Sequence, residues 1–394
     1  MQICICRVRV KEWIKISDLL FFQEGPGVRN TQYTQSGVKL LNVANLVNGK
    51  VDLSTSDRYI SEDEAYGRYK HFLCDDGDFI IASSGIKVEY FDRKMGFVDS
   101  SMLPLCMNTS TIRFKVIDSK RLNIKYFMYY LKSIHFKQQL SKFITGSAQL
   151  NFGPSHLKKM NMPLVSLKEQ NDIVEKLSKV ELLLDKYNGE IKLLDELIKA
   201  RFVEMFGNPA NNPYNFSKMK LGKICDVRDG THDSPKYQTV GYPLITSKNL
   251  TSGEIDFSNC NYIKEEDYKK INLRSEVTRG DIIMPMIGTI GNPIIVNTDI
   301  RFAIKNVALI KFNKNTLQNI YVKYFLGSDY FDFSVLRNIR GGTQKFIALK
   351  DLRDLDILVP PLELQNQFAS FVQEIDKSRL LSNHSLFLIK SLIF

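Results

Sequence analysis

The side chains best suited to acid–base chemistry lie in the loop DGTHDSPKY, at positions 229–237. His232 stands there between Asp229 and Asp233, and an imidazole held by a carboxylate is a common general base. A loop of similar polarity near the start of the chain, EGPGVRNTQYT at 24–34, has no histidine. The other histidines, at 71, 135, 156 and 384, show no metal-ligand spacing. We therefore interpret DGTHDSPKY as a recognition or turn loop without a catalytic base.

The motifs of enzymes that act on DNA are missing as well. An adenine or cytosine methyltransferase needs a glycine-rich cofactor loop and an Asn/Asp-Pro-Pro-aromatic run. The nearest stretch, NNPYNF at 211–216, lacks the second proline and reads as a linker turn. No GxxxxGK[ST] phosphate loop is present and the six cysteines form no CxxC pair, so neither ATP hydrolysis nor a zinc site is indicated. The sequence thus predicts no catalytic, cofactor-binding or metal site in this chain.

The chain contains an internal repeat. Gln170 and Gln365 stand 365 − 170 = 195 positions apart, and this offset holds without a gap from Tyr129 to Gln170. Ten of these 42 positions are identical, with second-copy members at 324, 326, 328, 331, 339, 341, 344, 352, 362 and 365. Chance resemblance between two helix starts is the poorer account of a match that runs through helix, loop and strand. A period this long indicates two similar domains rather than a solenoid.

Weaker matches between the two copies continue towards the N-terminus. The stretch LNVANLVNGKVDL at 41–53 matches ITSKNLTSGEIDF at 245–257, and GDFI at 77–80 matches GDII at 280–283. Short β-rich runs and one helix in each copy, near 124–143 and 320–338, predict mixed α/β domains. Asn319 is the expected N-cap of the second of these helices.

A polar, glycine-containing loop follows the predicted helix in each copy, TGSAQLN at 145–151 and RGGTQKF at 340–346. Such loops offer backbone N–H groups, amides and cations, which suit contacts with phosphates and base edges. A single loop of this kind would be read as a flexible connection. Its recurrence at the same register, with Gln149 matching Gln344, favours a function.

Two long helices are predicted to organise the chain. From 168 to 206 apolar residues recur in steps of four and three, the a/d pattern of a coiled coil. Gly207 and Pro209 mark its end. The same pattern moved by 195 positions predicts a second helix, interrupted at Arg379 and Ser382. We expect an antiparallel pair, with docking of each helix on a partner protein as the alternative; the seam would comprise Ile173, Leu177, Val180, Leu184, Ile191, Leu194, Ile198, Phe368, Val372, Ile375, Leu386 and Ile389.

Composition and charge narrow the class of protein. The 394 residues include 54 Lys+Arg against 43 Asp+Glu, a formal net charge of +11. A basic domain is a candidate for binding polyanions because phosphate neutralisation releases counterions, although net charge alone leaves an incidentally basic protein equally open. No apolar run approaches a membrane span, and MQICICRVRV at the start is too short and too interrupted by arginine for a secretory signal. A reduced cytoplasm fits best, and no membrane partner is expected.

Several of these stretches resemble the specificity subunits of type I restriction–modification enzymes. The run LKEQNDIVEKLSKVELLLDKYNGEIKLLDELIKARFVEMFGNP at 167–209 is similar to that family's central helix, and VPPLELQNQFASFV at 359–372 is similar to its distal region. VRDGTHDSPKYQTVGYPLITSKNL at 227–250 and EGPGVRNTQYTQSGVKLLNVANL at 24–46 resemble openings of its target-recognition domains. The resemblance covers nearly the whole chain from about position 12.

The resemblance implies a subunit without catalysis that reads a bipartite DNA target. It implies double-stranded DNA and two modification subunits as partners, the latter methylating adenine with S-adenosylmethionine. It also implies ATP- and Mg²⁺-dependent restriction subunits, so that every cofactor belongs to a partner chain. The expected fold is α+β, with two similar mixed α/β target-recognition domains at 1–165 and 208–361. Two long antiparallel coiled-coil helices, at 166–207 and 362–394, separate them in a pseudo-two-fold repeat.

Two other functional classes remain open at this point. A non-catalytic scaffold would use its helices to bind proteins, and a self-contained nuclease or methyltransferase would need an unrecognised site. The missing motifs argue against the enzyme. The different loops on matching frames argue against the scaffold, because two copies that read different bases would diverge there.

The loops predict specific DNA contacts. In the first copy these are Arg29, Asn30, Gln32, Lys87, Ser147 and Gln149. In the second copy they are Thr231, His232, Lys236, Lys248, Thr343, Gln344 and Lys345.

Overall fold

The computed structural model describes residues 12–142, 150–251, 253–287, 290–312, 316–335 and 346–393. The chain divides into two compact units, one of residues 1–187 with 384–394 and one of residues 188–383. Within the described residues, no helix combines the length and apolar character that crossing a membrane requires.

The first unit holds a mixed α/β domain. Its main sheet has the order β2-β11-β7-β9, and a smaller sheet has the order β10-β3-β6. Two-stranded ladders join β1 to β13, β12 to β8 and β4 to β5. The strands are β1 (Glu12–Lys15), β2 (Leu20–Glu24), β3 (Val38–Leu41), β4 (Leu46–Val47), β5 (Lys50–Val51), β6 (Tyr59–Ile60), β7 (Phe79–Ala82), β8 (Ser84–Ile86), β9 (Met95–Phe97), β10 (Leu105–Met107), β11 (Thr111–Val116), β12 (Leu150–Asn151) and β13 (Asn161–Leu164). The short helices are α1 (Glu62–Tyr66), α2 (Ile124–Leu131), α3 (Ile134–Ser141) and α4 (Pro154–Leu157).

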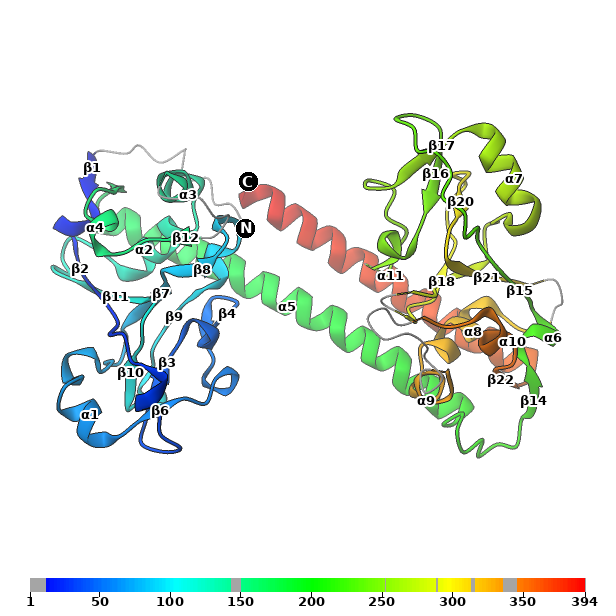
Figure 1. The fold of residues 1–394 in the computed structure, drawn as a ribbon, viewed down its shortest axis with the longest axis horizontal. Coiled ribbons are helices and arrows are strands. Elements are labelled where there is room, and N and C mark those ends of the chain that lie inside the picture. The colour runs from blue at the N-terminus through cyan, green and yellow to red at the C-terminus, as the bar shows by residue number, and fades with distance from the viewer. Residues whose placement is uncertain are drawn as a thin grey trace. The chain divides into compact units, whose positions relative to one another are not determined.

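The second unit repeats this arrangement. Its main sheet has the order β15-β21-β18-β19, its smaller sheet the order β17-β16-β20, and β14 pairs with β22. The strands are β14 (Ser217–Lys220), β15 (Asp226–Asp229), β16 (Tyr242–Ile245), β17 (Asn261–Ile263), β18 (Ile282–Pro285), β19 (Ile294–Ile295), β20 (Ala303–Ile304), β21 (Val307–Lys311) and β22 (Asp356–Val359). The short helices are α6 (Leu221–Ile224), α7 (Glu265–Ser275), α8 (Asn319–Leu326), α9 (Asp329–Val335) and α10 (Leu349–Arg353). Figure 1 shows α7 flanking the smaller sheet.

The matching strand orders confirm that the two copies fold alike. β2, β11, β7 and β9 correspond to β15, β21, β18 and β19, and the parallel pair β10–β3 corresponds to β20–β16. The repeated GD dipeptide has a structural reason in both copies. Asp78 and Asp281 are buried and accept the N–H of the residue three positions earlier, at 2.8 Å in each case. Lys115 and Lys311 lie beside these carboxylates as matched ion pairs.

The single helix predicted in each copy is wrong, because each is broken into two. In the first copy Ser133 interrupts the run, and its hydroxyl accepts the N–H of Phe136 to begin α3. In the second copy α8 ends at Leu326 and α9 begins at Asp329. The predicted N-cap is also wrong: Gln318 occupies that position, whereas the Asn319 amide donates to the Gly280 carbonyl at 2.9 Å.

Both predicted long helices are present, α5 (Leu167–Phe206) and α11 (Leu362–Ile393). Ser166 and Glu169 form a capping box at the start of α5, with bonds of 3.0 and 3.3 Å between side chain and backbone. Gly207 ends the helix with φ of +71° and donates its N–H to the Val203 carbonyl at 2.8 Å. A Cβ at this glycine would lie 2.3 Å from the Pro213 ring, so the position demands glycine.

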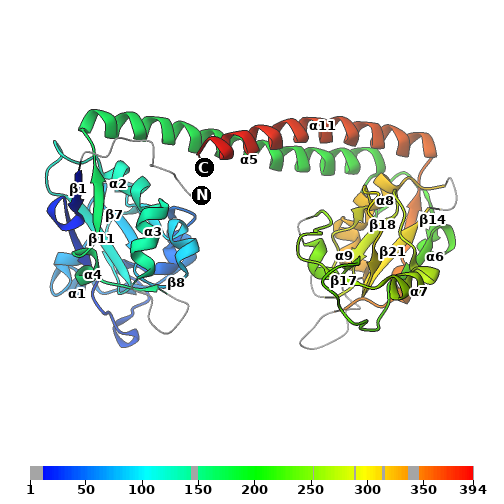
Figure 2. The ribbon, with the colours of Figure 1, turned by 90° about the horizontal axis from the view of Figure 1, so that it is seen from above.

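Within the second unit, α5 and α11 pack antiparallel. Phe202 meets Phe368 with ring centroids 5.5 Å apart, and Phe206 meets Phe368 at 5.4 Å. Seven residues earlier on α5, Asp195 binds Arg379, which lies eleven residues later on α11. Figure 2 shows the two helices side by side along this stretch. Arg379, an interruption of the apolar stripe in the sequence, therefore supplies an ion pair between the helices.

The residues of the predicted seam differ in burial. Ile173 and Leu177 pack against the first domain's core, and Ile198, Phe368, Val372 and Ile375 pack with the second domain's core. Val180, Leu184, Ile191 and Leu194 are half-buried, and Leu386 is buried. The side chain of Ile389 lies outside the described residues. The N-terminal part of α5 thus packs on the first domain, whereas its C-terminal part and the start of α11 pack on the second. The complete seam stays a prediction.

Candidate nucleic-acid interface

The two predicted recognition loops leave the main sheets at equivalent points. Gly25 donates its N–H to the Thr111 carbonyl and Gly230 to the Val307 carbonyl, both at 2.9 Å. A Cβ on Gly25 would lie 2.1 Å from the Asn108 carbonyl oxygen, and one on Gly230 would lie 2.2 Å from that of Ile304. Only glycine fits such a close backbone approach. The loops therefore start from one frame although their side chains differ.

The first loop is shaped by Gln32. Its amide donates to the Glu64 carboxylate at 2.6 Å and to the Tyr69 hydroxyl at 3.0 Å, and its oxygen accepts the Arg29 N–H at 3.0 Å. Because these bonds occupy the amide, Gln32 holds the loop in this structure. The side chains of Arg29 and Asn30 are exposed. All three remain predicted DNA contacts.

An exposed cation, Arg58, lies beside this loop and is not predicted by any motif of the sequence. The Arg58 guanidinium lies 5.2 Å from the centre of the Tyr33 ring and donates to its hydroxyl at 3.3 Å. The side-chain amide of Asn108 donates to the same hydroxyl at 3.5 Å and to Asn42 Oδ1 at 2.8 Å. Arg58 comes from the segment before β6, 25 residues from Tyr33, and no local motif signals that approach.

The second loop is held by a histidine network. His232 Nε2 lies 2.9 Å from the buried Asp229 carboxylate, and Nδ1 lies 2.8 Å from Asn306 Oδ1. Arg274 from α7 binds the other oxygen of Asp229. Both ring nitrogens of His232 therefore have partners within this network. The side chain is nevertheless 64% exposed, so it can still face a ligand as a cation.

The bonds to Asn306 and Asp229 raise the pKa of His232 above its ordinary value of 6.5. A raised folded-state pKa stabilises the fold fully below the unfolded pKa, and that contribution disappears as pH rises through the folded pKa. We expect the Hε1 resonance of His232 to titrate above 6.5, and Asn306→Ala to lower its midpoint. His71→Gln in the first domain is the matched control and should leave this midpoint unchanged. A midpoint insensitive to Asn306→Ala would contradict the assignment.

A pocket of about 500 Å³ opens beside this network. Thr231 and His232 line it from the loop, and Lys270 and Arg274 line it from one face of α7. Asp233 and Asp267 are also in the lining, so the pocket has mixed charge. The spacing of four between Lys270 and Arg274 is a helical signal that the sequence reasoning overlooked.

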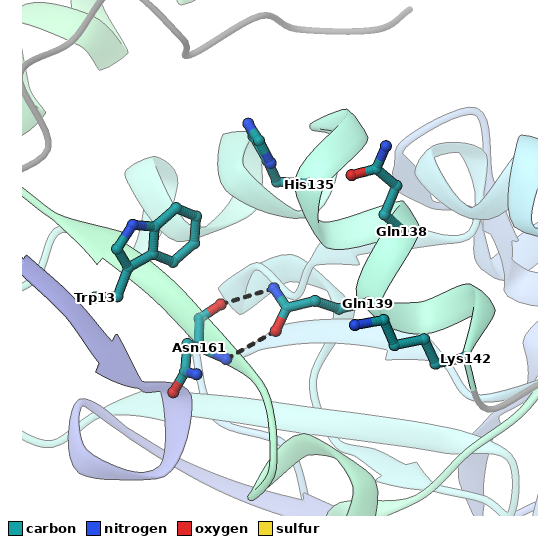
Figure 3. Close-up of a pocket in the computed structure, with 6 residues that line it drawn as sticks. All are labelled: Trp13, His135, Gln138, Gln139, Lys142 and Asn161. Carbon is teal, nitrogen blue, oxygen red and sulfur yellow. Dashed lines mark hydrogen bonds between the residues drawn. The ribbon is translucent and has the colours of Figure 1, made fainter.

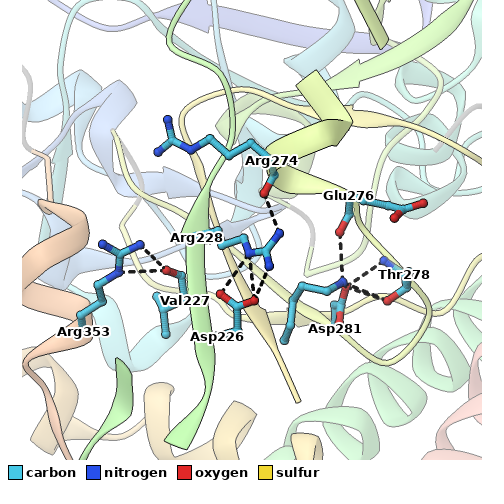
Figure 4. Close-up of polar contacts among 9 residues, drawn as sticks. Asp226, Val227, Arg228, Arg274, Glu276, Thr278, Asp281 and Arg353 are labelled. Atoms are coloured by element: carbon cyan, nitrogen blue, oxygen red, sulfur yellow. Dashed lines mark hydrogen bonds and ion pairs between the residues drawn. The ribbon is translucent and has the colours of Figure 1, made fainter. Parts of the chain in front are cut away.

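Behind the loop, a polar network fixes strand β15. Arg228 binds Asp226 through two nitrogens and donates to the Arg274 carbonyl at 2.9 Å. Arg353 from α10 donates twice to the Val227 carbonyl, at 2.9 and 2.7 Å. Figure 4 shows these contacts on the two sides of the strand, together with those around Asp281. They hold the base of the recognition loop against α7 and α10.

Five of the predicted contacts, Ser147, Gln149, Thr343, Gln344 and Lys345, lie outside the described residues. The flanks of their two segments are anchored alike. Phe152 donates its N–H to the Ser83 carbonyl at 3.0 Å, and Ile347 donates to the Met286 carbonyl at 2.9 Å. The predicted lysines Lys87, Lys236 and Lys248 are exposed. Thr231 and His232 are brought together at one pocket, whereas Lys248 lies apart on the turn after β16.

The first domain has a different open pocket, of about 600 Å³, between β1 and α3. Trp13 is 49% exposed there and meets His135 edge-on at 5.9 Å. Gln139 exchanges two bonds with the Asn161 backbone, at 2.9 and 3.0 Å. Figure 3 shows Lys142 at its margin. In the part of the chain that the structure describes, no three His, Cys, Asp or Glu side chains are grouped to hold a metal.

Comparison with known proteins identifies the family. The family model described as "Type I restriction modification DNA specificity domain" matches residues 11–194 and again residues 213–389. This chain belongs to that family. The double match confirms the resemblance inferred from the sequence and the organisation as two repeats.

Relatives and solved structures agree with the assignment. The EcoKI type I restriction enzyme specificity subunit of Escherichia coli is 19% identical over 268 residues, 63% of this chain and 57% of that one. The MjaVIII specificity subunit of Methanocaldococcus jannaschii is 25% identical over 178 residues, 44% of this chain and 40% of that one. A chain of the same archaeon assigned to the MjaX enzyme is 28% identical over 265 residues, 64% of this chain and 61% of that one. The chain thus aligns with less than two thirds of the length of each.

The fold match spans the whole chain. The crystal structure of a type I restriction-modification system S subunit from M. genitalium superposes with a TM-score of 0.55 at 15% identity, covering 100% of this chain and 96% of that one. This match confirms the fold class of two mixed α/β domains with two long helices.

Proposed function

We propose that this chain is the DNA-specificity subunit of a type I restriction–modification complex and reads a bipartite target, one half with each domain. The observation that carries this is the pair of recognition loops, which start from equivalent glycines on matching sheets but carry different side chains. A common frame with divergent loops is what reading two different base sequences requires, because base edges specify whereas backbone contacts position. The net charge of +11 supports binding to DNA.

The chemistry is proposed to reside in partner subunits. Two modification subunits would bring S-adenosylmethionine and methylate adenine, and restriction subunits would bring ATP and Mg²⁺, all in the cytoplasm. Exposed leucines on the long helices support docking of such partners: Leu182 is 70% exposed, Leu193 66% and Leu381 71%. These leucines also keep open the alternative of a purely protein-binding scaffold.

Reconstitution separates the two possibilities. The purified chain alone should neither methylate nor cleave DNA with S-adenosylmethionine, ATP and Mg²⁺, and adding modification subunits should give methylation at a defined bipartite sequence. A scaffold would leave the modified sequence independent of the loops. Turnover that stayed with the isolated chain through several columns would overturn the proposal.

Loop substitutions then test the contacts. If the side chain reads a base, Arg29→Ala and Asn30→Ala should each weaken the free energy of DNA binding by about 1–3 kcal/mol. Each should also relax specificity at one position of the first half-site. If Lys236 contacts a phosphate, Lys236→Ala should weaken binding to all DNA sequences alike. It should also reduce the slope of log affinity against log salt concentration by about one. Lys199→Ala, on an exposed face of α5, is the charge-matched control. Unchanged binding across Arg29, Asn30 and Lys236 variants would contradict the site.

A further inference from the structure

Two glutamines of the long helices are completely buried, Gln170 in α5 and Gln365 in α11. Gln170 donates to the carbonyls of Arg121 at 2.8 Å and Val165 at 3.0 Å. Its oxygen accepts the Asn123 N–H at 2.8 Å. Every hydrogen-bonding partner of this buried amide is therefore main chain of the adjoining recognition domain.

The second copy repeats these three bonds. Gln365 donates to the carbonyls of Thr316 at 3.1 Å and Pro360 at 2.8 Å, and accepts the Gln318 N–H at 2.8 Å. Each partner lies 195 positions after its counterpart, for example 316 − 121 = 195. The partner residue types all differ between the copies, since only their backbone is used, whereas the glutamine is the same. The contact has outlasted the divergence of the sequences around it.

Two further contacts reinforce the same junction. Asn123 donates to Asn171 at 2.8 Å, and in the second copy Gln318 donates to Asn366 at 2.6 Å. In each copy, a buried tyrosine of the recognition domain also donates its hydroxyl to a carbonyl of the strand that leads into the long helix. These bonds are Tyr126 to Pro163 at 3.0 Å and Tyr321 to Leu358 at 2.9 Å.

The junction is the place where a hinge would otherwise form. Val165 and Ser166 alone connect β13 to α5, and Pro360 and Pro361 alone connect β22 to α11. The glutamine lies in the first turn of each helix and ties it to the segment before α2 or α8. A helix of 40 residues is about 60 Å long, so a tilt of about 10° at its base moves its far end by about 10 Å.

We propose that Gln170 and Gln365 are positioning residues that fix each recognition domain on its long helix and thereby set the spacing of the two DNA half-sites. The inference rests on the proposed function. Neither side chain is available to touch DNA, because both are buried. Their effect would therefore fall on the distance between half-sites and leave the half-site sequences unchanged.

Gln170→Met tests the clamp with a side chain of similar length that cannot form the three bonds. Tyr130→Phe is the matched control. It removes a bond of 2.6 Å to the Asn161 carbonyl and one of 2.6 Å from the Gln139 amide within the same domain, and the second copy has Phe325 at that position. Spin labels attached to ketone-bearing unnatural amino acids at positions 62 and 186 avoid the six native cysteines. Both positions are exposed and both belong to the first unit. Pulsed EPR on the full chain should give a narrow distance distribution for the native protein and the control, and a broad one for Gln170→Met.

Sequencing of methylated sites in cells that also express the modification subunits supplies the second readout. Because a misplacement of about 1 Å can cost on the order of 100-fold in rate, Gln170→Met should lower methylation at native-spacer sites by roughly 10- to 100-fold. It should add sites whose spacer differs in length, with both half-site sequences retained. Tyr130→Phe should do neither.

An unchanged EPR width in Gln170→Met would overturn the clamp. A broadened width with native methylated sites would overturn its role in spacing. If the native chain directed methylation to no bipartite site, the proposed function and the spacing would both fall, while the EPR widths would still decide whether the glutamine holds the helix.

Discussion

Replacing Ile198 with aspartate should unfold the second domain and the adjoining parts of both long helices together. Ile198 is fully buried on α5 and belongs to the same core as Phe202, Phe368 and Val372. A carboxylate placed there without a partner should lower the free energy of unfolding of this unit by about 3–5 kcal/mol. Amide hydrogen exchange should therefore rise both in α5 and in the strands β15, β18 and β21.

Lys199→Asp, at the next and exposed position, is the control for this substitution. This control changes the net charge by more than Ile198→Asp does but removes no buried side chain. Amide hydrogen exchange should therefore stay as in the native protein. Exchange that rose in the helix alone would show that the seam and the domain core are separate structures, and would contradict their description as one unit. Methylation should be lost at complete bipartite sites, because the second half-site is no longer read.

Shortening the long helices by one heptad should shorten the DNA spacer. Deleting residues 185–191 from α5 and 380–386 from α11 removes seven residues from each helix, about 10 Å of rise. A heptad keeps the apolar face aligned, and the deletion spares Gln170, Ile198 and Phe368. DNA rises about 3.4 Å per base pair along one strand, so the spacer should lose up to about three base pairs while both half-site sequences survive.

Sequencing methylated sites in cells that express the deletion decides this prediction. An unchanged spacer beside intact methylation would mean that the helices serve only as docking surfaces. A control deletion of five residues from each helix, which rotates one part of the helix by about 140° against the other, should abolish methylation instead.

The repeat and the long helices could be predicted because both depend on regular patterns in the sequence. The 195-residue offset predicted two similar domains, and the alternation of four and three predicted α5 nearly to its ends. Ser133 was missed as a helix boundary because the apolar pattern continues across it, and its capping role depends on a single hydroxyl. In the sequence, Arg379 interrupts the apolar pattern of the second long helix. Its role as an ion-pair partner could not be predicted because Asp195 is 184 residues away.

The candidate interface was predictable in location but not in detail. The position of the loops followed from the repeat, whereas the roles of their side chains depend on contacts from distant segments. Gln32 and His232 were both predicted as DNA contacts from their polarity. In the structure, Gln32 is bonded to Glu64 on α1 and to Tyr69, and His232 is bonded to Asn306 on the turn after β20. No local sequence motif indicates that these distant segments come close to the loops. Arg58 could not be predicted for the same reason, whereas Arg274 had a signal in its spacing of four from Lys270.

We propose that each domain reads one half of the target independently, on a common frame. The most direct test replaces residues 217–360 with residues 12–165, which joins matching strands because β14 corresponds to β1 and β22 to β13. The resulting chain carries two copies of the first recognition domain on the native helices. Methylated sites should then become inverted repeats of the first half-site, with the native spacer. Sites that still contained the second half-site, or that lost both halves while the protein stayed folded, would show that the domains do not read the two half-sites independently.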